Sequence, residues 1–227
     1  MKIGILETGA PPRGLADRFG DYPDMVRKLL GDGHAFTTYD VAREKLPTTP
    51  EAQDAYVITG SPAGVYDDLS WITRLVEWLR EAKGRTKLVG ICFGHQVMAE
   101  AFGGTVAKSD RGWGVGLHRY DVQARAAWMD DAASFAIPVS HQDQIVEPPP
   151  RIRLLAGSAF CRFGLIAYED QPAVSLQCHP EFEPAFAQAL IEARRDRLPD
   201  PDTAIASLDQ PNDRERLGRW IGRFLQG

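Results

Sequence analysis

The chain has 227 residues, of which 44% are hydrophobic and 25% charged, and its formal net charge is −5. This length suffices for one large α/β domain with a substantial core, and the composition excludes a disordered or membrane-spanning protein. Because no long run of Lys and Arg is present, the chain lacks the basic surface of a general nucleic-acid binder. We therefore expect no nucleic-acid partner and no membrane association.

The N-terminus and the cysteines indicate a reducing compartment. The apolar run within Met1–Glu7 is too short for a signal peptide and far too short to span a bilayer. The three cysteines, Cys92, Cys161 and Cys178, form an odd set without C-x-x-C spacing, which argues against a disulfide framework and a structural zinc site. We expect reduced thiols, a cytoplasmic location, no metal and no cofactor.

The first ninety residues alternate short β-branched runs with helical segments, which is typical of parallel strands joined by right-handed crossovers. The predicted strands are Lys2–Leu6, Ala35–Tyr39, Ala55–Ile58 and Lys87–Ile91. Pro23 can occupy the first turn of a helix that continues to Leu30 and stops at Gly31. An apolar stripe at helical spacing predicts a crossover helix before the fourth strand. The stripe consists of Leu69, Ile72, Val76 and Leu79.

From Thr105 to Ile145, shorter extended pieces such as Trp113–Val122 predict antiparallel strands at one edge of the sheet. A last buried strand, Ala173–Gln177, precedes a helix from about Pro184 to Arg197, and Pro199–Pro201 reads as a linker. An amphipathic helix follows, and its stripe is more typical of a cover for the protein's own core than of a partner site. The stripe consists of Leu217, Trp220, Ile221, Phe224 and Leu225. We expect one domain over residues 1–227 with a C-terminal helical extension from about residue 200.

One cysteine stands in a G-x-C-x-G frame, with Cys92 between Gly90 and Gly94 at a predicted strand-to-helix turn. A nucleophile elbow needs small residues at the two flanking positions, because larger side chains would collide in the strained turn. The following helix, Gly94–Phe102, favours a thiolate at its amino end. A buried structural cysteine in a tight turn fits the same frame.

A histidine and a glutamate follow the last buried strand, in the segment Cys178-His179-Pro180-Glu181-Phe182. Open α/β sheets gather their active sites at the carboxyl edge, where this segment lies. A Cys–His pair needs a third group to hold the imidazole in one tautomer, and Glu181 can do so across the rigid proline. The alternatives are a loop histidine satisfied by local backbone and a solvated surface carboxylate.

Three separated segments, Tyr56–Pro62, Gly90–Gln96 and Gln177–Glu181, match a known pattern in order and spacing. The sequence resembles the class I, or triad-type, glutamine amidotransferase family, most closely the stand-alone members similar to the amidotransferase domain of GMP synthetase. The resemblance extends from the N-terminus to about residue 190. It implies a flavodoxin-like three-layer α/β sandwich, with a mostly parallel central sheet and antiparallel edge strands.

The same resemblance assigns roles to residues. It implies a triad of Cys92, His179 and Glu181, in which Cys92 forms a thioester with a γ-glutamyl group. The implied oxyanion hole uses backbone N–H groups of Gly60 or Ser61 and of Phe93, although an ordinary βα turn also explains the Gly60 segment. Further implied contacts to the glutamyl amino-acid head come from Gln96 and from the backbone of Trp113, Gly114 and Val115.

The segment Ser140-His141-Gln142-Asp143 is similar to a histidine and aspartate pair of the GMP synthetase branch. Gln142 stands where that branch has a glycine, so the conformation of the loop does not carry over. His141 and Asp143 either shape the substrate pocket or belong to an ordinary turn, and the motif favours neither.

Three functions remain open. The protein can be a glutaminase that hydrolyses glutamine and passes ammonia to a separate synthetase subunit, since the chain has no length for a synthetase domain and no Gly-rich loop followed by Lys and Ser or Thr. It can act alone as a γ-glutamyl hydrolase or peptidase on γ-glutamyl amines or glutathione-like peptides. A non-catalytic thiol sensor is disfavoured, because a sensor needs no oriented base.

A metal site is disfavoured as well. Its candidate ligands are Cys92, His95, Cys178 and His179. Neighbours in extended backbone point to opposite sides of the chain, so Cys178 and His179 are not expected to converge on one ion.

Overall fold

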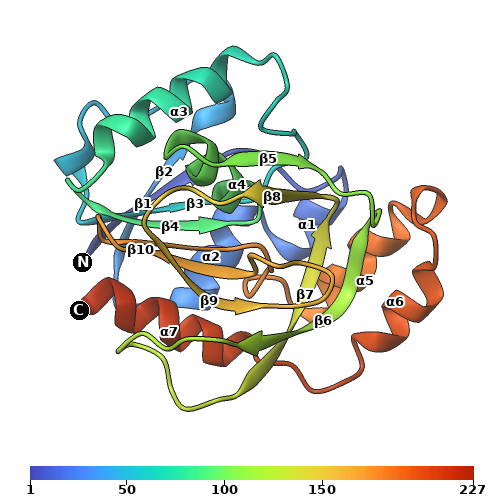
Figure 1. Cartoon of the computed structure of the whole chain (residues 1–227). Coiled ribbons are helices and arrows are strands. Elements are labelled where there is room, and N and C mark those ends of the chain that lie inside the picture. The colour runs from blue at the N-terminus through green and yellow to red at the C-terminus, as the bar shows by residue number, and fades with distance from the viewer.

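A large mixed sheet forms the centre of the computed structural model, which describes all residues 1–227 (Figure 1). Its strands are β1 (Lys2–Glu7), β2 (Ala35–Asp40), β3 (Ala55–Ile58), β4 (Lys87–Ile91), β6 (Gly114–Val122), β7 (Ser134–His141), β9 (Ile152–Gly157), β10 (Leu165–Tyr168) and β11 (Ala173–Leu176). They lie in the order β2-β1-β3-β4-β11-β10-β9-β6-β7. A separate two-stranded sheet pairs β5 (Thr105–Lys108) with β8 (Asp143–Glu147).

One half of the large sheet is parallel. The strands β2, β1, β3, β4 and β11 pair in parallel with their neighbours. Every residue of β3 and β11 is buried, as expected for parallel strands covered on both faces. The predicted positions of all four N-terminal strands and of the last strand are confirmed to within one residue at each end, and so is the flavodoxin-like α/β class.

The other half is antiparallel. Here β10 pairs with β11 and β9, and β6 pairs with β9 and, over most of its length, with β7. The predicted strand Trp113–Val122 corresponds to β6, and the expectation of antiparallel strands at one edge is confirmed.

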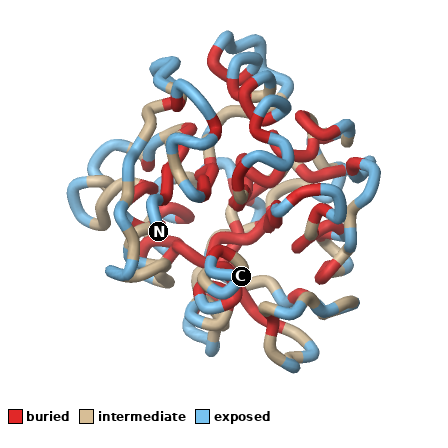
Figure 2. Tube along the Cα trace, turned by 90° about the vertical axis from the view of Figure 1, so that its left-hand side faces the viewer, coloured by how far each residue is buried: buried red, intermediate tan, exposed pale blue.

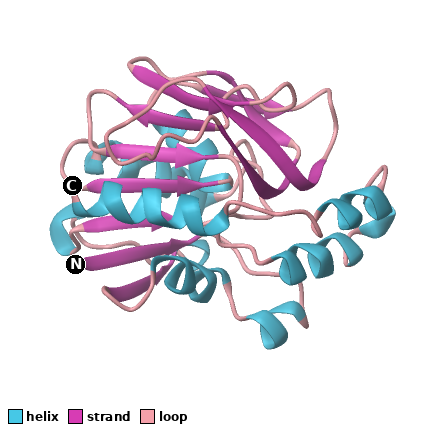
Figure 3. Cartoon of the chain, turned by 90° about the horizontal axis from the view of Figure 1, so that it is seen from below, coloured by secondary structure: helices cyan, strands magenta, loops and turns pink.

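Helices cover both faces of the sheet. They are α1 (Leu15–Phe19), α2 (Tyr22–Leu30), α3 (Ser70–Ala82), α4 (Phe93–Ala101), α5 (Pro184–Glu192), α6 (Pro201–Ser207) and α7 (Arg214–Gln226). One core cluster joins α2 and α7 to one face, and another joins α3 and α4 to the opposite face. Figure 3 shows α7 lying across the strands near the C-terminus. No helix combines the length and the apolar character needed to cross a membrane.

Burial follows these layers, since Figure 2 shows buried segments running through the middle of the molecule and exposed ones at its periphery. The stripe of the terminal helix faces inward: Leu217, Trp220, Ile221 and Leu225 are buried in the core shared with α2. Phe224 is partly buried against the same cluster.

The stripe predicted for α3 needs correction. Leu69 is not in the helix: its backbone is extended at the N-cap, and its side chain is 41% exposed. The face of α3 that packs on the sheet therefore differs from the predicted stripe, and Val76 is only partly buried. The buried side chains are Trp71, Ile72, Leu75, Trp78, Leu79 and Ala82.

The predicted helix Pro184–Arg197 is too long, because α5 ends at Glu192 and a separate 3-10 turn covers Arg195–Arg197. The predicted linker Pro199–Pro201 is also wrong, because it contains the start of α6. Asp200 caps this helix by accepting a hydrogen bond from Thr203 N at 3.1 Å, and Pro201 occupies its first turn.

Candidate active site

The turn between β4 and α4 has the backbone of a nucleophile elbow. Cys92 adopts φ 53° and ψ −102°, a conformation that costs free energy for a residue with a Cβ atom. A Cβ atom on Gly90 would lie 2.6 Å from the carbonyl oxygen of Gly94, and one on Gly94 would lie 2.3 Å from the carbonyl oxygen of Ile58. Both glycines are therefore required by close packing under the cysteine.

His179 and Glu181 lie on the loop after β11 and are nearly inaccessible, with side chains 4% and 3% exposed. The imidazole Nδ1 is 2.7 Å from Glu181 Oε1, which holds the ring in one orientation. Phe182 stacks on the same ring with centroids 3.9 Å apart, and the backbone N–H of His179 donates to Pro138 O at 2.9 Å. Three contacts thus hold the histidine in place.

The electrostatics of this histidine differ from those of an ordinary buried one. Burial alone lowers the pKa of His179, but the adjacent Cys92 and the carboxylate of Glu181 outweigh it and raise the pKa to about 10. In the resting protein Nε2 has no hydrogen-bond partner at standard geometry. Such contacts commonly tighten only when substrate is bound. The second ring nitrogen is therefore available to exchange a proton with Cys92.

A loop after β3 supplies backbone donors beside this pair. The carbonyl of Gly60 accepts a hydrogen bond from Thr8 Oγ1 at 3.1 Å, and Ser61 Oγ donates to Thr8 O at 2.7 Å. These two hydrogen bonds to Thr8 fix the position of the loop. The backbone N–H groups of Gly60, Ser61 and Phe93 donate to no acceptor within the protein. A Cβ atom on Gly60 would lie 3.2 Å from the His179 ring, so glycine best allows this approach.

Thr8 was missed by the motif reasoning. It follows β1, and its backbone N–H donates to Thr59 Oγ1 at 3.1 Å. Its hydroxyl group donates to Thr59 O at 3.0 Å or to Gly60 O at 3.1 Å, and also lies 3.2 Å from Thr59 Oγ1. The sequence could have indicated Thr8 because it lies just after the predicted strand Lys2–Leu6. Parallel strands end at the same edge of a sheet, so residues that follow them lie near the site.

The residues expected at the substrate pocket divide into two groups. Gln96, Trp113 and His141 line a cavity that reaches Cys92, whereas Gly114 and Val115 are absent from its wall. Val115 instead packs against the cluster formed by α5 and α6. The contacts expected of Trp113, Gly114 and Val115 are made by their backbone, so the direction of the Val115 side chain does not decide them, and they stay a prediction.

Gln96 and His141 both contact Asp143, the first residue of β8. Gln96 Nε2 donates to Asp143 O at 2.8 Å and to Gln177 Oε1 at 3.1 Å, so its amide nitrogen is engaged within the protein. His141 Nδ1 lies 3.2 Å from Asp143 O. Burial, assisted by the neighbouring His179, lowers the pKa of His141 to about 3, which keeps this ring neutral. His95 is not at the site: its Nδ1 contacts Ser175 Oγ at 2.7 Å beneath the elbow.

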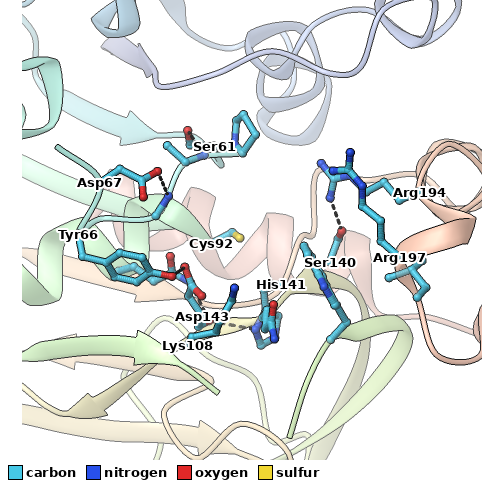
Figure 4. Close-up of a pocket in the computed structure, with 17 residues that line it drawn as sticks. Ser61, Tyr66, Asp67, Cys92, Lys108, Ser140, His141, Asp143, Arg194 and Arg197 are labelled. Carbon is cyan, nitrogen blue, oxygen red and sulfur yellow. Dashed lines mark hydrogen bonds between the residues drawn. The ribbon is translucent and has the colours of Figure 1, made fainter. Parts of the chain in front are cut away.

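The cavity over Cys92 has a volume of about 360 Å³ and is lined mainly by polar side chains (Figure 4). Its wall includes four residues that the motifs did not indicate: Tyr66, Lys108, Arg194 and Arg197. Tyr66 donates a hydrogen bond to Asp143 Oδ2 at 3.0 Å and so joins the loop after β3 to the start of β8. No short motif marks these four positions, because they come from separate segments of the sequence that meet only in the folded structure.

The start of α7 holds the loop that carries His179 and Glu181. Arg214 Nε donates to Pro180 O at 2.9 Å, and its guanidinium also donates to Glu181 O at 3.4 Å. Asp213 pairs with the backbone of Ala136 on β7 through hydrogen bonds of 2.8 Å in both directions. The C-terminal segment therefore links the candidate catalytic loop to the antiparallel half of the sheet.

Comparisons with known proteins identify the family to which the chain belongs. Residues 26–194 match the family model described as "GATase: Glutamine amidotransferase class-I". The chain is similar to gamma-glutamyl peptidase 3 of Arabidopsis thaliana, with 33% identity over 185 residues that cover 77% of this chain and 74% of the relative. It is also similar to the glutamine-hydrolyzing GMP synthase subunit of Methanopyrus kandleri, with 29% identity over 182 residues, 74% of this chain and 88% of the relative.

A solved structure shows the same fold. The crystal structure of a glutamine amidotransferase from Thermotoga maritima superimposes with a TM-score of 0.80 and 18% identity, covering 100% of this chain and 99% of that one. The family match spans most of the sequence and settles the classification. The chain belongs to the class-I glutamine amidotransferase family.

Proposed function

We propose that this protein hydrolyses a γ-glutamyl amide, that of glutamine or of a related γ-glutamyl compound, through a thioester on Cys92. The observation that carries the proposal is the pairing of a cysteine in a strained elbow with a buried histidine that is itself 2.7 Å from Glu181. Such a set combines a nucleophile, a base and a group that orients the base. Membership of a family of hydrolytic enzymes supports it.

In the first half of the reaction, the proton shared by Cys92 and His179 lies on the imidazole, as the raised pKa of His179 favours, and the sulfur attacks the side-chain carbonyl carbon of the substrate. The N–H groups of Phe93 and of Gly60 or Ser61 donate to the oxygen as it becomes negative, and each such donor contributes about 3 kcal/mol in a characterised hydrolase. The C–N bond then breaks as His179 gives its proton to the leaving nitrogen, and the amine departs.

In the second half, His179 removes a proton from a water molecule, which attacks the thioester carbonyl. The C–S bond breaks, glutamate leaves, and the proton stays on His179 beside the released sulfur of Cys92. Glu181 keeps Nδ1 protonated and Nε2 directed at the reacting groups throughout, without itself carrying the proton.

The first candidate substrate is glutamine, with the ammonia passing to a separate synthetase subunit. The relative from Methanopyrus kandleri supports this reading, because its name describes a glutamine-hydrolysing part of GMP synthase. The second candidate is a γ-glutamyl amine or peptide, hydrolysed without a partner. Two observations favour it: the relative named gamma-glutamyl peptidase 3, and a cavity of about 360 Å³ over Cys92, which has room for a leaving group larger than ammonia.

A thiol sensor is the weaker alternative, because an oriented His179–Glu181 pair has no role in simple oxidation of a cysteine. The other two cysteines, Cys161 and Cys178, are buried and free. We propose a cytoplasmic location, where such thiols remain reduced.

The test is steady-state release of glutamate by the purified protein from L-glutamine and from a panel of γ-glutamyl amides and peptides, beside Cys92→Ala. Rapid turnover of one γ-glutamyl compound that is lost in the variant supports a self-sufficient hydrolase. Slow turnover of glutamine alone, still dependent on Cys92, supports a missing synthetase partner. Absence of Cys92-dependent turnover on every substrate contradicts the proposal.

A further inference from the structure

Three arginines that follow α5 differ sharply in their partners. Arg195 forms ion pairs with Glu192 at 2.8 Å and with Asp202 at 2.9 Å. Arg194 has no acidic partner and donates one hydrogen bond, to Ser140 Oγ at 3.2 Å. The side chain of Arg197 forms no ion pair and no hydrogen bond within the protein, although it lines the cavity. The two arginines that reach the cavity are thus the two without a carboxylate partner.

The acidic side chains of the cavity do not neutralise them. Asp67 accepts a hydrogen bond from Gly64 N at 2.9 Å, and Asp143 accepts one from Tyr66 at 3.0 Å. In Figure 4 these two carboxylates and the two arginines lie on either side of Cys92. A third cation, Lys108, also lines the cavity and has no ion-pair partner. Three cations therefore face two carboxylates, and none of the three cations has a carboxylate partner.

A γ-glutamyl head cannot account for this excess by itself. It carries one carboxylate and one ammonium group, so it brings no net charge, and the ammonia released from glutamine brings none either. Guanidinium groups are suited to bind carboxylates through paired hydrogen bonds. We propose that the site selects γ-glutamyl compounds whose leaving amine carries a carboxylate of its own, bound by Arg194 and Arg197.

This inference rests on the proposed function and specifies its substrate class: γ-glutamyl amino acids and peptides. The bonds that change are those of the general reaction. Cys92 Sγ bonds to the γ-carbonyl carbon, the C–N bond to the amino acid breaks, and His179 protonates the departing nitrogen. The arginines do not touch the reacting atoms; they hold the carboxylate of the leaving amino acid so that its nitrogen lies beside His179.

The experiment compares kcat/KM for γ-glutamylglycine and for γ-glutamylmethylamide, which lacks only the carboxylate of the leaving amine. The wild-type protein is expected to prefer γ-glutamylglycine by about ten-fold, the effect of a charge-assisted hydrogen bond at a partly solvated site. The double variant Arg194→Gln/Arg197→Gln is expected to reduce this ratio to near unity. Arg195→Gln is the matched control, because its side chain pairs outside the cavity, and its ratio should equal that of the wild type.

Each other outcome has a defined meaning. A wild-type ratio near unity with Cys92-dependent hydrolysis of both compounds overturns the inference and leaves the proposed function standing. An equal loss on both substrates in the double variant also overturns it, because the arginines would then bind the glutamyl carboxylate. Hydrolysis of neither compound overturns the inference. It overturns the proposed function as well only if L-glutamine, assayed beside them, is not hydrolysed either. If the double variant does not fold, Arg197→Gln alone, at an exposed position, must still lower the ratio.

Discussion

The two halves of the sheet contribute different parts of the site. In the parallel half, four neighbouring strands, β1, β3, β4 and β11, end at one edge, and the segments that follow them carry Thr8, Gly60, Cys92 and His179. Other parts of the cavity wall come from elsewhere: His141 from the end of β7 in the antiparallel half, Lys108 and Asp143 from the separate β5–β8 sheet, and Arg194 and Arg197 from the segment after α5. Groups suited to the chemistry thus come from adjacent parallel strands, and groups suited to recognition come from elements added beside them.

If the parallel half carries the chemistry, the largest effect should come from the base. His179→Asn is expected to lower kcat by about 10³-fold or more, since loss of a triad base removes proton transfer in both half-reactions. The measurement is glutamate release from the best γ-glutamyl substrate. His118→Asn, on β6 and outside the cavity over Cys92, should stay within a few-fold of the wild type, and an equal loss in both variants would contradict this division.

A second large effect is expected on stability at the elbow. Gly94→Ala places a Cβ atom 2.3 Å from the carbonyl oxygen of Ile58, a backbone atom that cannot move aside cheaply. The free energy of unfolding should fall by about 3 kcal/mol or more, as for severe overpacking. The measurement is urea unfolding.

The control is Gly222→Ala in α7, where a Cβ atom meets nothing within 4 Å. This change should raise the free energy of unfolding by up to about 1 kcal/mol, because alanine favours a helix. Equal destabilisation by the two substitutions would show that close packing under Cys92 is not the cause.

A smaller effect on activity is expected at Arg214, which connects the C-terminal helix to the loop that carries His179. Arg214→Gln removes the donors to the carbonyl oxygens of Pro180 and Glu181, so the loop that carries His179 loses part of its support. We expect kcat to fall by about ten-fold with little change in KM, because misplacement of the base affects the reaction more than binding. Arg219→Gln, exposed on the same helix, is the matched control. A change in KM alone would argue for a binding role.

The smallest expected effect concerns pH. The pKa of His179 is about 10 in the folded protein and near its ordinary value of 6.5 in the unfolded chain. Proton binding therefore stabilises the fold fully below pH 6.5, and this contribution is lost as pH rises through 10. Glu181→Gln removes one of the negative partners, so its destabilisation should be larger at pH 6 than at pH 9. Urea unfolding at both values measures it, and the opposite order would contradict the raised pKa.

The sequence predicted the parallel half well because local patterns determine it. Buried β-branched runs indicated the strands, and the close packing at Gly90 and Gly94 left a visible G-x-C-x-G frame. The other half was less readable. The start of α6 at Pro201 was mistaken for a linker, since proline is common both in linkers and in the first turn of a helix. Thr8, Tyr66 and the arginines reach the site only through the tertiary arrangement, which no local pattern in the sequence marks.

The most direct test of the central claim is mass spectrometry of the protein after acid quench of a reaction with a γ-glutamyl substrate. A covalent γ-glutamyl adduct on the peptide that contains Cys92, absent from Cys92→Ala and accumulating before steady state, is the predicted result. Turnover that continues in Cys92→Ala, or an adduct confined to Cys161 or Cys178, would contradict it.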